Sequence, residues 1–288
     1  MQFVTDFDEV KLLDMANGEK LEKWGKYLLI RPDPQIVWSK KSLPKLWEKA
    51  DARYIRSKTG GGHWELKNKL PDSWQVSYNN LTFNIKPMGF KHTGLFPEQA
   101  VNWNYMMNKI KERTRKGKTV KVLNLFAYTG GATVACLEAG ASVCHVDSSK
   151  GMVSWAKENV ISSGLKDKPV RFIIDDVLKF VSREIKRGNK YDAIVMDPPS
   201  YGRGANGEVW SLESDLEDLI KLCKEILNED FLFFIINTYS TNLPSVSLEN
   251  ILKLNFKNKK ILVDDLCLPI EDSDIYLSCG ITGRVENE

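Results

Sequence analysis

A regular alternation of strand-like and helix-like segments after residue 120 is the feature that most limits the fold of this chain. Short apolar runs of strand length alternate there with amphipathic stretches of helix length. The predicted strands are 121–126, 142–147, 169–174, 191–196 and 231–236, and the predicted helices are 132–140, 150–164, 177–185, 212–227 and 245–255. Strands connected in this way run parallel, and their crossover helices cover both faces of the sheet. Two further predicted strands, 259–268 and 275–283, are joined by a short polar turn and favour an antiparallel hairpin at the sheet edge.

The first 90 residues have a different pattern, in which short alternating or aromatic runs are separated by turn residues. These runs are YLLIRP (27–32), ARYIRS (52–57), GHWEL (62–66) and WQVSYNNLTFNIKP (74–87). In the last run, Asn79–Asn80 separates two strand-like halves and predicts a β-hairpin. A helix is predicted over 97–115, with Pro97 in its first turn. We therefore expect a small β-rich module over residues 1–90 and an α/β domain over residues 91–288.

Basic residues and tryptophans are concentrated in the first part of the chain. The whole sequence holds 41 Lys and Arg against 38 Asp and Glu. Residues 1–119 hold 22 basic and 13 acidic residues, whereas residues 120–288 hold 19 and 25. Six of the eight tryptophans also lie before residue 119. This composition favours RNA as a partner of the first part, because Lys and Arg neutralise phosphates and aromatic rings stack on unpaired bases. A solvated charged surface and a small aromatic core would give the same composition.

Other features of the composition argue against a secreted or membrane protein. The five cysteines, at 136, 144, 223, 267 and 279, are odd in number and have no CxxC spacing, which argues against a disulfide framework and a zinc site. No apolar run approaches the ~18 residues of a membrane span, and the N-terminus has no secretory-signal pattern. We therefore expect a cytoplasmic protein with reduced thiols and no membrane contact.

The first candidate ligand site is NLFAYTGG, residues 124–131, directly after the first strand of the α/β domain. Ligands of an open α/β sheet bind beyond the carboxyl ends of its strands. Gly130 and Gly131 allow a tight turn and a close approach of the backbone, and the following helix N-terminus favours a negative group. The segment lacks the GxGxxG pattern of dinucleotide sites, and a plain glycine turn is the alternative interpretation.

Acidic residues follow the next two strands. Asp147 ends the second strand, where its carboxylate can accept both hydroxyl groups of a ribose. Asp175 and Asp176 follow the third strand, where one carboxylate can accept an exocyclic amine of adenine. The alternative role for each aspartate is a helix cap, and Ser148 or Ser149 could cap the helix after Asp147 instead.

The segment DPPSY, residues 197–201, follows the fourth strand. Its two prolines stiffen the turn and remove backbone donors, so their carbonyl groups are left as acceptors. Asp197 adds a further acceptor for a nucleobase N–H or amino group, and Tyr201 can stack on a flat ring. An ordinary proline turn without a ligand would explain the stiffness of the segment, but not the presence of both Asp197 and Tyr201.

In this order and at these separations, NLFAYTGG, HVD (145–147), IIDD (173–176) and DPPSY resemble the motifs of class I S-adenosylmethionine-dependent methyltransferases. Within that class the chain is most similar to the bacterial ribosomal-RNA large-subunit methyltransferase-like group, which has a small N-terminal module before the catalytic fold. HTGLFPEQ (92–99) resembles that group's segment over the cofactor. The resemblance implies a Rossmann-like sheet of seven mostly parallel strands with a C-terminal antiparallel hairpin.

The resemblance also implies roles for individual residues. Phe126, Ala127 and Gly130 would hold the methionine part of S-adenosylmethionine, Asp147 its ribose, and Asp176 with Val177 its adenine. The full set of residues expected to bind the cofactor is Phe96, Gln99, Asn124, Phe126, Ala127, Tyr128, Thr129, Gly130, Asp147, Ser148, Asp175, Asp176, Val177 and Asp197. The residues expected at the methyl-transfer site are Asp197, Pro198, Pro199 and Tyr201.

The chemistry expected at this site is direct methylation of a base nitrogen of ribosomal RNA. Cytosine-C5 methyltransferases of this group use a cysteine thiolate as nucleophile. Here Tyr239 stands after the fifth strand where that cysteine would lie, and DPPSY contains none. Cys223, Cys267 and Cys279 are expected to be packing residues. Covalent C5 chemistry is therefore not expected.

Three alternatives remain from the sequence. A methyltransferase that acts on a protein or a small molecule would share every cofactor motif. A nicotinamide-dependent dehydrogenase would use the glycine turn and Asp147 but would leave DPPSY without a role. An RNA-binding module without catalysis would not need intact cofactor positions. His63, His92 and His145 have no metal-binding spacing, so no metal is expected, and His145 is expected in the core. The sequence makes no prediction about the oligomeric state.

Overall fold

The computed structural model describes residues 1–57, 61–87, 89–203, 209–239, 242–271 and 273–287. The chain forms two compact units. The αβ unit comprises Met1, Asn102–Leu266 and Gly280–Glu288, and the β unit comprises Gln2–Val101 and Cys267–Cys279. The tip of the C-terminal hairpin thus belongs to the β unit, since Ile270 bridges to Leu12 there. The boundary expected at residue 90 stays a prediction.

The αβ unit is built on a seven-stranded sheet with the order β10-β9-β8-β11-β14-β16-β15. Its strands are β8 (Lys121–Leu125), β9 (Ser142–Asp147), β10 (Val170–Ile174), β11 (Ala193–Met196), β14 (Phe233–Thr238), β15 (Lys260–Pro269) and β16 (Tyr276–Glu286). The first five strands pair in parallel, and β16 pairs antiparallel with β14. The predicted parallel sheet and the C-terminal hairpin at its edge are confirmed.

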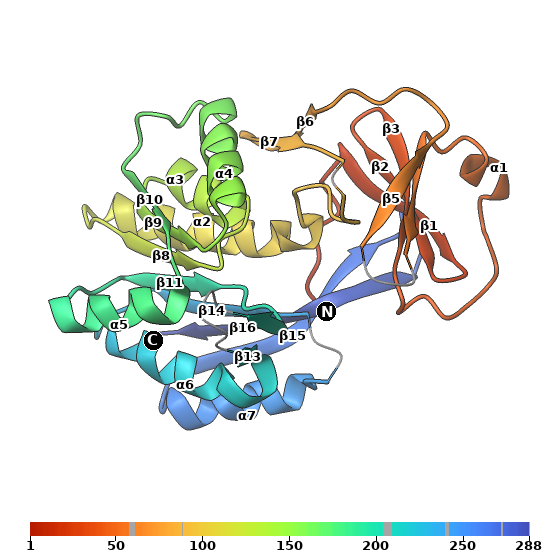
Figure 1. Ribbon diagram of the computed structural model, residues 1–288. Helices are drawn as coiled ribbons and strands as arrows, with labels where there is room; N and C mark the ends of the chain where they lie inside the picture. Colours follow the sequence, from red (N-terminus) through yellow and green to blue (C-terminus); the bar gives the residue numbers. More distant parts are fainter. Residues whose placement is uncertain (58–60, 88, 204–208, 240–241, 272, 288) are drawn as a thin grey trace. The chain divides into compact units, whose positions relative to one another are not determined.

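Helices cover both faces of this sheet, as predicted (Figure 1). The helices α2 (Ala100–Arg115), α3 (Gly131–Glu138) and α4 (Lys150–Ser162) lie on one face, and α5 (Val177–Arg187), α6 (Leu212–Glu225) and α7 (Ser245–Asn255) lie on the other. The main core forms where the apolar sides of α5, α6 and α7 pack on the buried strands β8, β9, β11 and β14. The strands are apolar on both sides, which is typical of a parallel sheet covered by helices.

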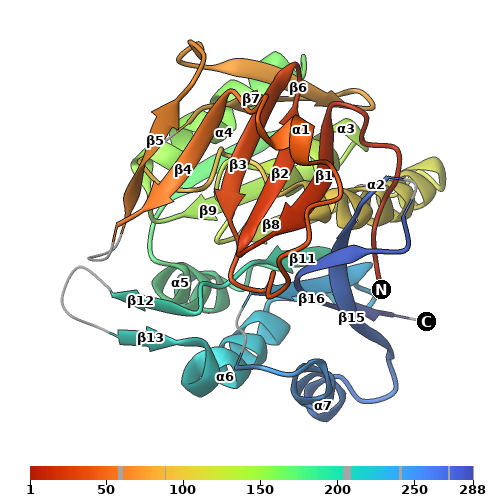
Figure 2. The same cartoon turned by 90° about the vertical axis from the view of Figure 1, so that its right-hand side faces the viewer.

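The β unit contains a five-stranded sheet with the order β1-β2-β3-β4-β5 (Figure 2). Its strands are β1 (Val10–Ala16), β2 (Glu19–Trp24), β3 (Tyr27–Pro32), β4 (Ala52–Arg56) and β5 (Gly62–Leu66). The unit also contains the short helix α1 (Pro44–Trp47), the hairpin strands β6 (Trp74–Tyr78) and β7 (Leu81–Ile85), and a 3-10 turn, η1 (Pro97–Gln99), that leads into α2. The expected β-rich character of this part of the chain is confirmed.

Two tight hairpins of the β unit have the same turn chemistry, but only one of them was predicted. Tyr78 pairs with Leu81 around Asn79, whose φ of 50° suits the predicted turn. The hairpin between β1 and β2 was missed, although Asn17–Gly18 is the strongest short-range signal for such a turn. Both residues have positive φ, 53° and 75°, which asparagine and glycine tolerate better than other residues.

A third hairpin lies in the long loop between the predicted strand 191–196 and the predicted helix 212–227. There β12 (Tyr201–Arg203) pairs antiparallel with β13 (Val209–Ser211). These short strands have no alternating apolar pattern, so periodicity does not predict them. Residues 204–208 of that loop lie outside the described residues.

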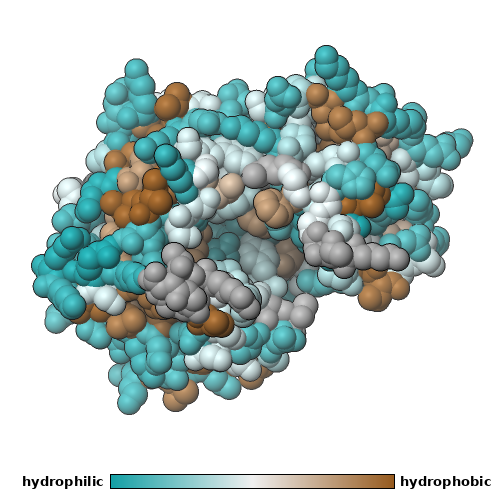
Figure 3. All heavy atoms as spheres, in the orientation of Figure 1, coloured by the Kyte–Doolittle hydropathy of each residue, from teal (hydrophilic) through white to brown (hydrophobic). Residues whose placement is uncertain are grey.

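Hydrophilic residues cover most of the face shown in Figure 3, and hydrophobic residues lie there in small separate patches. None of the described helices combines the length and the apolar character needed to cross a bilayer. Within the described ranges, no group of three or more His, Cys, Asp or Glu residues is arranged to hold a metal ion.

The buried carboxylate of Asp14 organises the chain around β1. It is 2 % exposed, and its Oδ1 accepts the backbone N–H of Met15 at 2.9 Å. Its Oδ2 accepts the N–H groups of Ser42 at 2.9 Å, of Leu43 at 2.8 Å and of the Trp47 indole at 2.8 Å. One carboxylate therefore ties β1 to the segment that carries α1.

We predict that Asp14→Ala lowers the free energy of unfolding of the β unit by about 3 kcal/mol, because four N–H donors, two of them buried, lose a charged acceptor. Urea denaturation monitored by tryptophan fluorescence measures this change. Asp72→Ala, at an exposed position, is the control and should leave the midpoint unchanged. Equal midpoints for the two variants would contradict the role given to Asp14.

Candidate active site

The register of the parallel strands aligns their carboxyl ends at one edge of the sheet. Leu125 of β8 lies beside Val146 of β9 and Met196 of β11, and Ile174 of β10 lies beside Asp147. The strand order reverses between β8 and β11, which is the usual ligand position in open α/β sheets. The turn after β8 and the DPPSY motif after β11 flank this reversal point.

The turn after β8 is held in an unusual backbone conformation. Phe126 and Tyr128 have φ values of 52° and 49°, in the left-handed region that bulky residues avoid. Gly130 precedes α3 with a φ of 80°, and a Cβ there would lie 3.0 Å from the Cβ of Ala156. Ala127 donates to the carbonyl of Val146 at 3.1 Å, which fixes the turn on β9. Strain of this kind needs firm support from the surroundings, and it is concentrated at functional sites.

A buried chain of polar side chains supports this turn from below. Asn124 donates to Thr133 Oγ1 at 2.9 Å, and Thr133 Oγ1 lies 2.9 Å from Nδ1 of His145. Burial lowers the pKa of His145 to about 3, so the ring is neutral. The amide of Asn159 donates to the carbonyl of Thr129 at 2.8 Å. His145 is therefore a core residue, as predicted, and Asn124 lies in the interior.

Asp147 joins the turn to the end of β9. Its Oδ2 accepts the N–H of Tyr128 at 2.8 Å, and its Oδ1 accepts the N–H of Ser149 at 2.8 Å. The carboxylate is half-buried, and each oxygen can accept a second hydrogen bond. Ser149 caps α4 by accepting from Met152, so Asp147 is not used as the helix cap, and Ser148 is exposed.

The aspartates after β10 have structural partners of their own. Asp176 caps α5 and accepts the N–H of Lys179 at 2.9 Å through one carboxylate oxygen. Asp175 forms an ion pair with Arg183, and its N–H donates to the carbonyl of Asp147 at 3.1 Å. Val177, the first residue of α5, is buried. Asp176 therefore acts as a helix cap, which was the alternative role expected for it. The cap uses only one of its two carboxylate oxygens.

The DPPSY motif begins directly beside the turn after β8. Asp197 donates its N–H to the carbonyl of Leu125 at 3.4 Å, and its side chain is half-buried. Pro198 is buried and Pro199 is exposed. Tyr201 is 56 % exposed, as a ring that stacks on a ligand from outside the protein would be. The motif thus places a carboxylate, two proline carbonyls and an open aromatic ring within five residues.

Trp210 contacts both motifs and was missed from the sequence. Its indole N–H donates to the carbonyl of Pro199 at 2.6 Å, and its ring centroid lies 6.1 Å from that of Phe126. No motif pattern includes Trp210, which lies nine residues beyond Tyr201. Its position depends on the β12–β13 hairpin, which the sequence did not reveal.

No described cysteine occupies the place of a nucleophile beside this edge. Tyr239 follows β14, and β16 approaches it closely at Gly280, where a Cβ would lie 2.7 Å from the carbonyl of Thr238. Cys136 and Cys223 are fully buried, and burial raises the pKa of each thiol. Burial raises the pKa values of the Cys144 and Cys279 thiols as well.

Phe96 and Gln99 lie in the β unit, at η1. Gln99 is buried, and Phe96 packs on His92 with ring centroids 5.2 Å apart. Burial and the neighbouring Arg31 cation lower the pKa of His92 to about 3. Arg31 also donates to the carbonyl of Lys91 at 3.2 Å, which fixes the start of this segment.

Arg31 is itself held by a buried ion pair. Its guanidinium donates to both carboxylate oxygens of Glu22, at 2.6 and 2.8 Å. Bidentate pairs of this kind are geometrically specific. The position of the segment before Phe96 therefore depends on β2 and β3.

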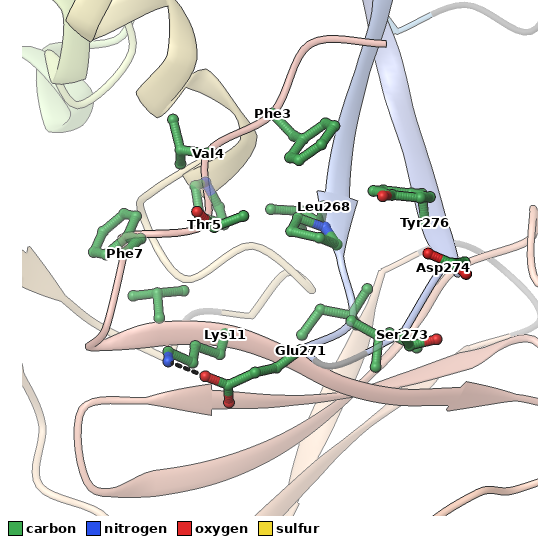
Figure 4. A pocket seen from close by; sticks show the side chains of 15 residues that line it. Phe3, Val4, Thr5, Phe7, Lys11, Leu268, Glu271, Ser273, Asp274 and Tyr276 are labelled. Atoms are coloured by element: carbon green, nitrogen blue, oxygen red, sulfur yellow. Dashed lines mark hydrogen bonds and ion pairs between the residues drawn. The ribbon is translucent and has the colours of Figure 1, made fainter.

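A separate cavity of about 490 Å³ lies within the β unit (Figure 4). Its walls come from the N-terminal segment and from the tip of the C-terminal hairpin, with Phe3 and Tyr276 on one side. The Lys11–Glu271 ion pair, at 2.7 Å, crosses its lower wall in that view. None of the predicted site residues lines this cavity, so it is distinct from the candidate active site.

The chain matches known proteins over most of its length. A family model described as S-adenosylmethionine-dependent methyltransferase matches residues 52–275. Ribosomal RNA large subunit methyltransferase K from Neisseria meningitidis serogroup B is 26 % identical over 250 residues, which cover 84 % of this chain and 68 % of that protein. Ribosomal RNA large subunit methyltransferase K/L from Syntrophotalea carbinolica is 28 % identical over 204 residues, which cover 68 % of this chain. The match covers only 27 % of that longer relative.

A solved structure is similar over the whole chain. The crystal structure of a SAM-dependent methyltransferase from Agrobacterium tumefaciens matches with a TM-score of 0.94 and 34 % identity, and the match covers 100 % of this chain and 93 % of that chain. The family model and this relative name the same class of enzyme. The protein described here therefore belongs to the S-adenosylmethionine-dependent methyltransferase family.

Proposed function

We propose that this protein transfers a methyl group from S-adenosylmethionine to a base nitrogen of large-subunit ribosomal RNA, without a covalent cysteine intermediate. The observation that carries this proposal is the DPPSY motif, which follows β11 at the strand-order reversal, beside the turn that follows β8. An acceptor held at Asp197 would thus lie close to a methyl donor held at Phe126–Gly130.

The residues after β8 and β9 fit the cofactor. Asp147 is fixed by two backbone N–H groups and keeps acceptor capacity on both oxygens, which suits the two hydroxyl groups of a ribose. The strained turn from Phe126 to Gly130, with Ala127, Tyr128 and Thr129 between them, would hold the methionine part at the start of α3. Asn124 would act from the interior, by supporting that turn through Thr133.

The adenine would be held by the segment after β10. Asp176 uses one carboxylate oxygen as the cap of α5, so the other oxygen would accept the exocyclic amine, with Val177 beside the ring. Asp175 and Ser148 would complete the surroundings of the adenine and the ribose. Phe96 and Gln99, in the β unit, stay predicted cofactor residues. Each of these roles is part of the proposal.

Methyl transfer is an in-line displacement, so the protein mainly aligns the acceptor with the donor. S-adenosylmethionine, when bound, supplies the electrophilic methyl group on its sulfonium. Asp197 would accept an N–H of the base and orient its lone pair, and it would take up the proton that the nitrogen releases. The Pro198 carbonyl would accept from the same group, and Tyr201 would stack on the ring of the base.

The thiols support a route without a covalent enzyme–base bond. A nucleophilic cysteine must be a thiolate, and burial raises the pKa values of Cys136, Cys144, Cys223 and Cys279. Cys267 is 2 % exposed and lies in β15. A ring or amino nitrogen carries its own lone pair and needs no such nucleophile.

The names of the relatives and the charge distribution support ribosomal RNA as the substrate. Both curated relatives described above are named as ribosomal RNA large subunit methyltransferases. Residues 1–119 carry the excess of basic residues that binding to a phosphate backbone requires. Five free cysteines are consistent with a cytoplasmic location, where ribosomal RNA is found.

The direct test is methyl transfer from labelled S-adenosylmethionine to purified ribosomal RNA, followed by nuclease digestion and mass spectrometry of the nucleosides. The proposal requires the label on a base nitrogen. Label on carbon 5 of a pyrimidine, or only on protein or small molecules in a parallel extract, would contradict it.

We predict that Asp147→Ala weakens binding of S-adenosylmethionine by at least about a hundredfold, because two charge-assisted hydrogen bonds to the ribose are lost. Calorimetric titration measures the dissociation constant, and the melting temperature shows whether the variant is folded. Asp167→Ala, at an exposed loop position, is the matched control. Unchanged affinity of a folded Asp147→Ala variant would refute the ribose assignment.

For Asp197→Ala we expect kcat to fall about a hundredfold or more, with a dissociation constant for S-adenosylmethionine within about threefold of wild type. Asp197→Asn keeps one acceptor oxygen and should retain part of the activity if the carboxylate mainly orients the acceptor. Full activity of Asp197→Ala would remove this residue from the reaction.

A variant in which all five cysteines are changed to alanine should keep its methyltransferase activity, because no thiolate takes part. Should that variant not fold, treatment of the wild-type protein with iodoacetamide at neutral pH gives the same test, and activity should persist. Loss of activity in a folded cysteine-free variant would support a covalent route.

A further inference from the structure

We infer that Trp210 is a positioning residue for methyl transfer, which holds the Pro199 carbonyl and the Phe126 ring in one arrangement. This inference rests on the proposed role of Asp197–Tyr201 as the acceptor site. Trp210 lies on β13, so it belongs neither to the turn after β8 nor to the DPPSY motif. It makes a specific contact with each of them.

The first contact determines which acceptors of the motif remain for the substrate. Proline nitrogens donate no hydrogen bond, so the backbone of Pro198–Pro199 offers acceptors only. The Pro199 carbonyl is occupied by the Trp210 indole N–H at 2.6 Å. An N–H of the acceptor base would therefore be accepted by Asp197 or by the Pro198 carbonyl, while the hydrogen bond from Trp210 holds the Pro199 carbonyl in place.

The second contact supports the strained part of the turn after β8. Phe126 has a φ of 52°, a strained conformation for a bulky residue, and its surroundings must compensate for that strain. The Trp210 ring packs against the Phe126 ring at 6.1 Å with an interplanar angle of 41°. Aromatic pairs at such distances attract each other. A change at Trp210 would thus loosen both the turn after β8 and the DPPSY motif.

Trp210 can act as a fixed support because its own backbone is anchored on both sides. The strands β12 and β13 lie side by side (Figure 2), and Gly202 pairs with Trp210 and Tyr201 with Ser211. Ser211 donates its N–H to Asp215 at 2.7 Å. Leu212, the buried first residue of α6, donates to the carbonyl of Ser200 at 3.0 Å. The hairpin is therefore tied to the core through α6.

The first test is Trp210→Phe, which keeps a flat ring and removes the N–H donor. We expect kcat for methyl transfer to fall by about tenfold to a hundredfold, with the dissociation constant for S-adenosylmethionine within twofold of wild type. Trp38→Phe is the matched control, because it removes one indole hydrogen bond, to the carbonyl of Met15 at 2.8 Å, in the β unit. An unchanged kcat of Trp210→Phe, or an equal loss in Trp38→Phe, would overturn the inference.

The second test needs no methyl acceptor. The indole N–H signal of Trp210 is identified in ¹⁵N-labelled protein by its loss in Trp210→Phe. It should shift when S-adenosylmethionine is added, because Phe126 contacts both the indole and the proposed cofactor site. A signal that does not respond to bound cofactor would overturn the coupling. If ribosomal RNA is not methylated but this signal shifts, the RNA substrate is refuted while the inference about Trp210 stands.

Discussion

Register in the parallel part of the sheet determines which side chains meet at its carboxyl edge. Leu125, Val146 and Met196 lie side by side, so the residues that follow them leave the sheet at the same level. A shift of one residue in any of these strands would turn its side chains to the opposite face. Burial of the apolar side chains on both faces of these strands fixes their register. The polar groups that follow β8, β9 and β11 therefore lie close together.

The carboxyl edge combines strain with firm support. Two bulky residues of the turn after β8 have positive φ, and the Asp147 carboxylate holds the N–H of one of them, Tyr128. From below, the neutral His145 ring and Asn124 meet at Thr133. From the other side of the reversal point, Trp210 packs on Phe126. Support of this kind organises the edge without a ligand, which would lower the entropy cost of aligning the proposed donor and acceptor.

Most of the αβ unit could be predicted from the sequence because each of its strands is a short apolar run and each crossover helix has one apolar side. The motif residues could be placed for the same reason, since Asp147, Asp175 and Asp197 directly follow such runs. The hairpin at Asn17–Gly18 had a local signal that was overlooked. The contacts of Trp210 had no local sequence signal. They depend on the β12–β13 hairpin, which has no periodic pattern, and on the Phe126 ring after β8, which is distant in sequence. The Asp176 cap shows a further limit: a cap and a ligand contact use the same residue type at the same position.

We propose that the carboxyl edge of β8, β9 and β11 binds S-adenosylmethionine. The decisive measurement is calorimetric titration of the wild-type protein with S-adenosylmethionine, with NAD⁺ titrated in parallel. We expect saturable binding of one S-adenosylmethionine per chain and no heat of binding for NAD⁺. Binding of NAD⁺, or of neither compound, would refute this assignment.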